Sequence, residues 1–211
     1  MSSEEGSHDY AAMALGQFLD ELASGNATPG GGAASAVAGA MGAALVSMVC
    51  RLTIGRKKYE QYERDLQAVL ARAEGLRPQF IAQAQADAAA YERVITAMKM
   101  PKDTPEQESA RRQVLDEALK QATIVPLRTA AMAMEVMHLA REVKAKGNRN
   151  AASDAAVAFT LGATAFEGGL ANASINIPLI KDLAFAAGQA DKVTALRREF
   201  ATLQAADATG E

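Results

Sequence analysis

Apolar residues recur along this chain in alternating steps of three and four. Between residues 80 and 98, Phe80, Ala84, Tyr91, Val94 and Met98 fall on one such stripe. This spacing is typical of a helix that packs one face on a core. Short β-branched or aromatic runs bounded by turns, which would indicate strands, are hard to find. The pattern therefore predicts an all-α fold, a single-domain bundle of long, tightly packed helices.

Turn residues divide the chain into helical segments. We expect helices over 10–24, 33–53, 59–98, 105–146, 153–177 and 183–205. Pro126 should kink the fourth, because proline lacks the backbone donor that a helix needs. Thr104 is placed as its N-cap, with Gln107 as the capping-box partner. We expect a loose tail over 1–9 and one domain over 10–211.

The run from Ala33 to Cys50 carries no charge and is just long enough to span a bilayer. It consists mostly of Ala, Gly and Ser, whereas insertion depends on larger apolar residues. Small residues recur every four positions, at Ser35, Gly39, Ala43 and Ser47, which allows helices to approach closely. We therefore expect a buried helix of a soluble protein, with no membrane contact.

Overall composition excludes several classes of function. The net charge of −3 argues against a nucleic-acid partner. The single cysteine, Cys50, excludes an intrachain disulfide, and the acidic, polar N-terminus does not resemble a signal peptide. A cytoplasmic protein is expected. With two histidines and one cysteine, zinc-ligand spacing is absent, and we predict no metal site.

Two aspartates occupy apolar stripes. Asp87 lies between Ala84 and Tyr91 on the stripe described above, and Asp154 is in phase with Leu161 and Asn172. A buried carboxylate is costly unless paired, and burial raises its pKa. The two acids are candidates for an acid/base pair. Structural alternatives remain: Asp154 as a helix cap, and Asp87 as the partner of an arginine.

Two further motifs suggest an anionic ligand. Gly30, Gly31 and Gly32 permit a sharp turn and expose backbone N–H groups at a helix start; a purely structural turn is the alternative. No P-loop or dinucleotide pattern accompanies them. The basic run Arg56, Lys57 and Lys58 is either a solvated helix end or a binding site for the carboxylates of a ligand.

The segment "TPGGGAASAVAGAMGAALVSMVCRLTIGRKKY" resembles the signature of the formiminotetrahydrofolate cyclodeaminase family, which includes bacterial methenyltetrahydrofolate cyclohydrolases. The motifs "DAAAY", "MPKDTPE", "VPL", "GNRNAASDAAVA" and "NASIN" follow in the same order. The resemblance extends over residues 18–182. The chain departs from the family where another acid often stands, at Ala88–Ala90, and where a glycine is common, near Ala155 or Ala156.

This resemblance implies an all-helical homodimer, or a higher homo-oligomer, with a folate site near the subunit interface and no metal or redox cofactor. Asp87 and Asp154 would then handle protons and stabilise charge on a cyclic amidine. The residues that would bind the substrate are Gly30, Gly31, Gly32, Ser35, Arg56, Lys57, Lys58, Lys102, Asn148, Asn172 and Asn176.

The resemblance leaves three activities open. The expected one is hydrolysis of 5,10-methenyltetrahydrofolate to 10-formyltetrahydrofolate, because no formiminotransferase domain accompanies the helical domain. The second is cyclodeamination of 5-formiminotetrahydrofolate with release of ammonia. The third, from another class, is a helical interaction protein that has lost activity.

Overall fold

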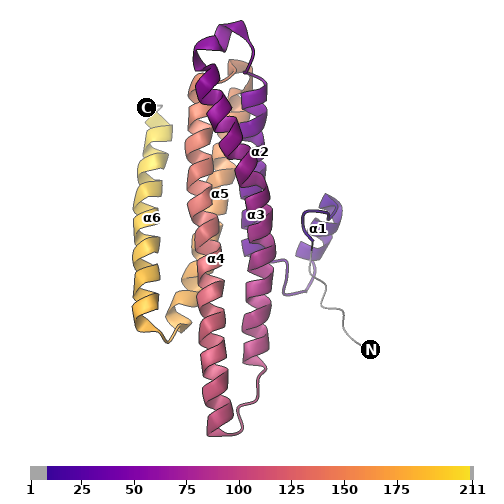
Figure 1. Cartoon of the computed structure of the whole chain (residues 1–211), viewed down its shortest axis with the longest axis vertical. Coiled ribbons are helices and arrows are strands. Elements are labelled where there is room, and N and C mark those ends of the chain that lie inside the picture. Colours follow the sequence, from indigo (N-terminus) through magenta and orange to yellow (C-terminus); the bar gives the residue numbers. More distant parts are fainter. Residues whose placement is uncertain (1–8, 210–211) are drawn as a thin grey trace.

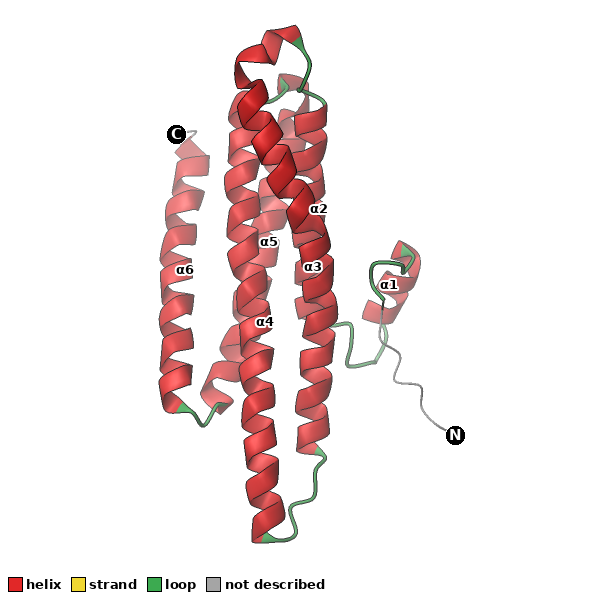
Figure 2. Cartoon of the chain, in the orientation of Figure 1, coloured by secondary structure: helices red, strands yellow, loops and turns green. Residues whose placement is uncertain are grey.

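Helices and the turns between them make up the part of the chain that the structure describes. The computed structural model describes residues 9–209, and no strand occurs among them (Figure 2). Most of the expected tail, residues 1–8, lies outside the described residues. Six helices are present: α1 (Leu15–Leu22), α2 (Gly31–Arg51), α3 (Glu63–Met98), α4 (Pro105–Lys146), α5 (Ala152–Asn176) and α6 (Leu183–Thr209). The predicted all-α fold is confirmed.

Four of these helices form an elongated bundle (Figure 1). α2 packs on α3 and α5, and α4 packs on the same two helices from the opposite corner. α6 lies along the outside of α4 and α5, and α1 lies on the other side of the bundle (Figure 1). Short 3₁₀ turns, η1 (Lys57–Tyr62), η2 (Arg149–Ala151) and η3 (Ile177–Leu179), connect the long helices. α3 and α4 extend beyond the start of α2 at one end (Figure 1).

α2 is the central helix that the sequence predicted. It is long and apolar enough to cross a membrane by composition, yet 56% of its most apolar window is buried inside the bundle. Ala36, Ala43, Val46 and Val49 are completely inaccessible. The apolar residues of α2 therefore pack against neighbouring helices, as expected.

Glycines allow the helices to approach one another closely. A Cβ on Gly39 of α2 would overlap the ring of Phe80 on α3, and one on Gly42 would come within 3.0 Å of the Ala158 carbonyl oxygen on α5. These contacts explain the small-residue ridges, because any larger side chain would force the helices apart.

The signals at helix ends are largely confirmed. Thr104 and Gln107 form the predicted capping box at the start of α4. Two predicted boundaries were wrong. α3 begins at Glu63, because the segment before it coils as η1, and α1 begins only at Leu15.

Pro126 lies inside α4, as predicted, and it leaves a backbone carbonyl free to bind a side chain of α5. Proline cannot donate to the carbonyl four residues earlier, which is that of Ala122. Asn176 Nδ2 donates to this oxygen at 2.9 Å. The end of α5 is thereby fixed against α4.

We expect Gly39→Ala to lower the free energy of unfolding by about 1–3 kcal/mol, because the added methyl group overpacks against Phe80. Gly188→Ala in α6 is the matched control: it meets no atom within 4 Å and should stabilise by about 0.5–1 kcal/mol. Urea unfolding of both variants checks this. Equal stability of the two variants would contradict the packing argument.

Candidate functional site

The side chain of Asp87 on α3 meets the first turn of α2. A Cβ on Gly32 would overlap the Asp87 carboxylate, so glycine is required there for lack of space. The backbone N–H of Ala33 donates to the same carboxylate. The first N–H groups of a helix have no partner within the helix, and an anion beside them is stabilised. Two of the predicted site residues, Gly32 and Asp87, are therefore in direct contact.

Burial dominates the acidity of this group. It raises the pKa of Asp87 to about 6, and the hydrogen bond from Ala33 opposes part of that rise. A carboxyl group with this pKa exchanges a proton readily near neutral pH, as a general acid or base must.

Three other predicted residues gather around this helix start. Ser35 is buried, donates to the Gly31 carbonyl oxygen at 2.6 Å and lies against Gly168 of α5. Asn172 of α5 lies beside Gly31 and donates to the Gly168 carbonyl oxygen at 2.8 Å. We call the group of Gly31, Gly32, Asp87 and Asn172 the glycine-end site.

The glycines act differently from the prediction. None of Gly30, Gly31 and Gly32 has a positive φ; among the described glycines only Gly55 does. A Cβ on Gly30 or Gly31 would make only ordinary contacts, at 3.6 Å. The sharp turn therefore does not require them, and Gly32 alone is needed for a close approach to a side chain.

Tyr91 lies one helical turn beyond Asp87 and was expected in the core. It is 43% exposed, and Met98 on the same stripe is 46% exposed. Phe80, Ala84 and Val94 on this stripe are buried as predicted, but α2 begins opposite Asp87 and leaves Tyr91 and Met98 in the following turns of α3 exposed. An aromatic ring is therefore accessible on the same helix as the buried acid.

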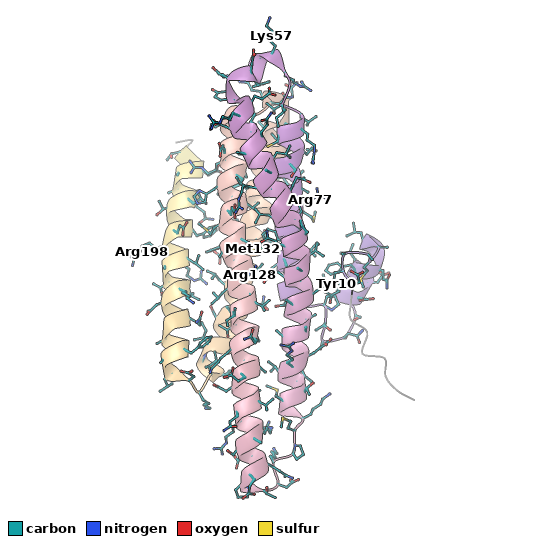
Figure 3. All side chains as sticks on the ribbon, viewed as in Figure 1. Tyr10, Lys57, Arg77, Arg128, Met132 and Arg198 are labelled. Carbon is teal, nitrogen blue, oxygen red and sulfur yellow. The ribbon has the colours of Figure 1, made fainter. Side chains whose placement is uncertain are left out.

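The predicted basic run and Asp154 lie at the other end of the bundle. Arg56, Lys57 and Lys58 are exposed at η1 (Lys57 in Figure 3). Arg149 N–H donates to Tyr59 Oη, which brings η2 beside η1. Asp154 follows in the first turn of α5. We call Arg56, Lys57, Lys58 and Asp154 the basic-end group.

Asp87 and Asp154, the predicted acid/base pair, therefore lie far apart within one chain. Asn172, in the glycine-end site, lies eighteen residues after Asp154 on α5, roughly 27 Å along the helix axis. Asp154 is only half-buried. Its stripe is not buried throughout: Ala165 is inaccessible, but Val157 is 50% exposed.

Two predicted ligand-binding asparagines already have structural partners. Asn148 is buried; its N–H donates to Thr53 Oγ1 at 2.9 Å and its Nδ2 to the Leu52 carbonyl oxygen. It joins the end of α2 to the start of α5. Asn176 Nδ2 is bound by the Ala122 and Asn172 carbonyl oxygens. Lys102 is exposed in the loop between α3 and α4, apart from both groups.

An uncharged surface connects the two ends of the bundle, and the sequence analysis missed it. Between Gly31 and Cys50 on α2 there is no charged residue, and between Ala155 and Asn176 on α5 only Glu167 is charged; that residue pairs with Arg197 of α6. Exposed apolar residues on these helices are Met41, Val157 and Ile175. We call this surface, formed by α2 and α5, the uncharged face.

No group of three or more His, Cys, Asp or Glu side chains within residues 9–209 is placed to hold a metal ion. The glycine-end site itself offers one carboxyl group, backbone N–H groups and an amide.

We expect Asp87→Asn to stabilise the protein in a pH-dependent way. The pKa of Asp87 is about 6 in the folded chain and 3.8 as an ordinary carboxyl group, so ionisation opposes folding as pH rises from 4 to 6. The variant should be no more stable than wild type below pH 4 and more stable by roughly 2–3 kcal/mol above pH 6. Urea unfolding across this range checks it, and a gain that is independent of pH would contradict it.

Comparison with known proteins gives consistent results. The model of the family described as formiminotransferase-cyclodeaminase matches residues 14–195. The chain is 45% identical over 88% of its length to a methenyltetrahydrofolate cyclohydrolase of Methylorubrum extorquens, of which it covers 89%. It is 35% identical over 89% of its length to the formimidoyltransferase-cyclodeaminase of Sus scrofa, of which it covers 35%.

The fold has a counterpart among solved structures. A crystal structure of formiminotetrahydrofolate cyclodeaminase from Thermotoga maritima superposes with a TM-score of 0.82, at 28% identity and 92% coverage of both chains. The sequence match spans the four bundle helices together with both groups of predicted site residues. The chain belongs to the formiminotransferase-cyclodeaminase family.

Proposed function

We propose that this protein is a cytoplasmic methenyltetrahydrofolate cyclohydrolase, which converts 5,10-methenyltetrahydrofolate to 10-formyltetrahydrofolate. The observation that carries the proposal is the buried Asp87 against the start of α2, with a pKa of about 6. The chain is 45% identical to a named cyclohydrolase and 28% identical to a named cyclodeaminase of similar coverage, which supports hydrolysis over cyclodeamination.

The reaction requires three proton transfers. Water adds to the cationic methenyl carbon and loses a proton to the ionised Asp87 carboxylate as the C–O bond forms. The C–N5 bond then breaks, its electron pair stays on N5, and Asp87 returns the proton to that nitrogen. The proton of the new hydroxyl group leaves as the formyl group forms. Such proton transfer typically contributes 10²- to 10⁴-fold, and it requires neither a metal nor a redox cofactor.

Asp87 also provides negative charge beside the cationic amidine, which a buried site makes effective. The exposed ring of Tyr91, one turn away, offers a surface on which the flat aromatic part of a folate can stack. Lys102, which was expected to bind the glutamyl carboxylates, lies in the loop after α3, well beyond the glycine-end site.

A homodimer would bring together the glycine-end site and the basic-end group, which lie at opposite ends of one chain. If two copies pack antiparallel through the uncharged face, a two-fold axis near its middle places the basic-end group of one copy beside the glycine-end site of the other. Uncharged helix faces favour such burial, and a two-fold interface is self-complementary. Each of the two resulting sites would hold Asp87 from one subunit, and Asp154 with Arg56, Lys57 and Lys58 from its partner.

The activity itself is tested by the ultraviolet absorbance of 5,10-methenyltetrahydrofolate. We expect wild type to accelerate its loss. Gly32→Ala should lower kcat/KM at least about 100-fold, because the new methyl group displaces Asp87. The control Gly188→Ala on α6, whose Cβ meets no atom within 4 Å, should stay within about threefold of wild type.

A second assay follows the appearance of the methenyl compound from 5-formiminotetrahydrofolate, with release of ammonia. Activity in this assay alone would identify a cyclodeaminase instead. Inactivity in both assays would favour an interaction protein without catalytic function.

The composite site makes a separate prediction for mixed dimers. Asp87→Asn and Asp154→Asn should each lose most activity, since each homodimer lacks one acid at both sites. Coexpressing the two variants should restore about a quarter of wild-type activity: half of the random dimers are mixed, and each mixed dimer has one intact site of two. No recovery despite formation of mixed dimers would place both acids in the same chain's site, or remove one of them from the mechanism.

A further inference from the structure

Gln83 on α3 carries a buried amide that the fold does not use. The residue is 7% exposed, and its Oε1 atom has no hydrogen-bond partner among the described residues. Most buried polar atoms in native proteins have a partner, and leaving a buried acceptor unpaired costs roughly 1–3 kcal/mol. A group with such a cost and no structural benefit requires another explanation.

The position of Gln83 relates it to the glycine-end site. It lies four residues before Asp87 on α3, and residues at this spacing are neighbours on a helix surface. Along the helix it falls between Phe80, which contacts Gly39, and Asp87, which contacts Gly32. Two buried side chains with acceptor oxygens therefore lie one turn apart beside the start of α2.

The chemistry of these two acceptors determines what can join them. An ionised carboxylate and an amide oxygen both accept hydrogen bonds, so they cannot satisfy each other. A water molecule has two hydrogens, and it can donate one to each acceptor. Its lone pairs then point away from both of them, toward whatever occupies the site.

We propose that Gln83 and Asp87 together hold the water that attacks the methenyl carbon. The inference rests on the proposed cyclohydrolase function. One O–H of the water donates to Asp87, which takes that proton as the C–O bond forms. The other O–H donates to Gln83 Oε1, which fixes the direction of attack without changing its own protonation. Orienting a nucleophile in this way contributes to the rate and not to substrate affinity.

The test is Gln83→Met, which keeps the length of the side chain and removes the acceptor. We expect kcat for hydrolysis to fall about 10- to 100-fold, with KM within about threefold of wild type. The thermal midpoint of the ligand-free protein should be unchanged or higher, because an unpaired buried oxygen has been removed. Gln79→Met is the matched control: Gln79 is exposed on the same helix, bound only to the Gly75 carbonyl oxygen, and its loss should leave kcat unchanged.

Each contrary outcome has a definite meaning. A lower thermal midpoint or failure of Gln83→Met to fold would show that the amide serves the core, and would overturn the inference. Unchanged kcat in a stable Gln83→Met variant would overturn it while the proposed function stands. An inactive wild type would overturn the proposed function and this inference with it.

Discussion

A single close approach, between the Asp87 carboxylate and the first turn of α2, organises this structure. It requires a glycine at position 32, because any side chain there would occupy the space of the carboxylate. It requires α2 to begin opposite the middle of α3, with its first N–H groups free to meet an anion. The extension of α3 beyond that point, which leaves Tyr91 accessible, follows from the same arrangement.

The interior of the bundle is apolar in its middle and contains buried polar groups near the start of α2. Between Gly39 and Phe80, and between Gly42 and Ala158, close packing is purely apolar or backbone contact. At Asp87 and Gln83 the same helices bury a carboxyl group and an unpaired amide oxygen. Polar groups retained at such cost are typical of functional sites, where activity is gained against stability.

The sequence predicted the helices well because local signals determine them. The capping box at Thr104 and the small-residue ridge of α2 depend only on neighbouring residues. The phase of Asp87 and Asp154 on their helices did not show that they lie far apart within one chain, because phase on a helix says nothing of position along the axis. Asn148 and Asn176 were predicted to bind the ligand. Instead, the side-chain amide of Asn148 donates to the end of α2, and that of Asn176 donates to the Ala122 carbonyl oxygen that Pro126 leaves unpaired. These partners come from distant parts of the sequence, so local patterns could not reveal them.

The central claim is that Asp87 is a buried acid at a ligand site, and its own titration tests this most directly. Carbon-13 NMR of labelled aspartate carboxyl groups, assigned by comparison with Asp87→Asn, would follow it with and without tetrahydrofolate. The account predicts a midpoint near pH 6 and a change in the Asp87 signal when the folate is added. A midpoint near 4 and no response to the folate would contradict it.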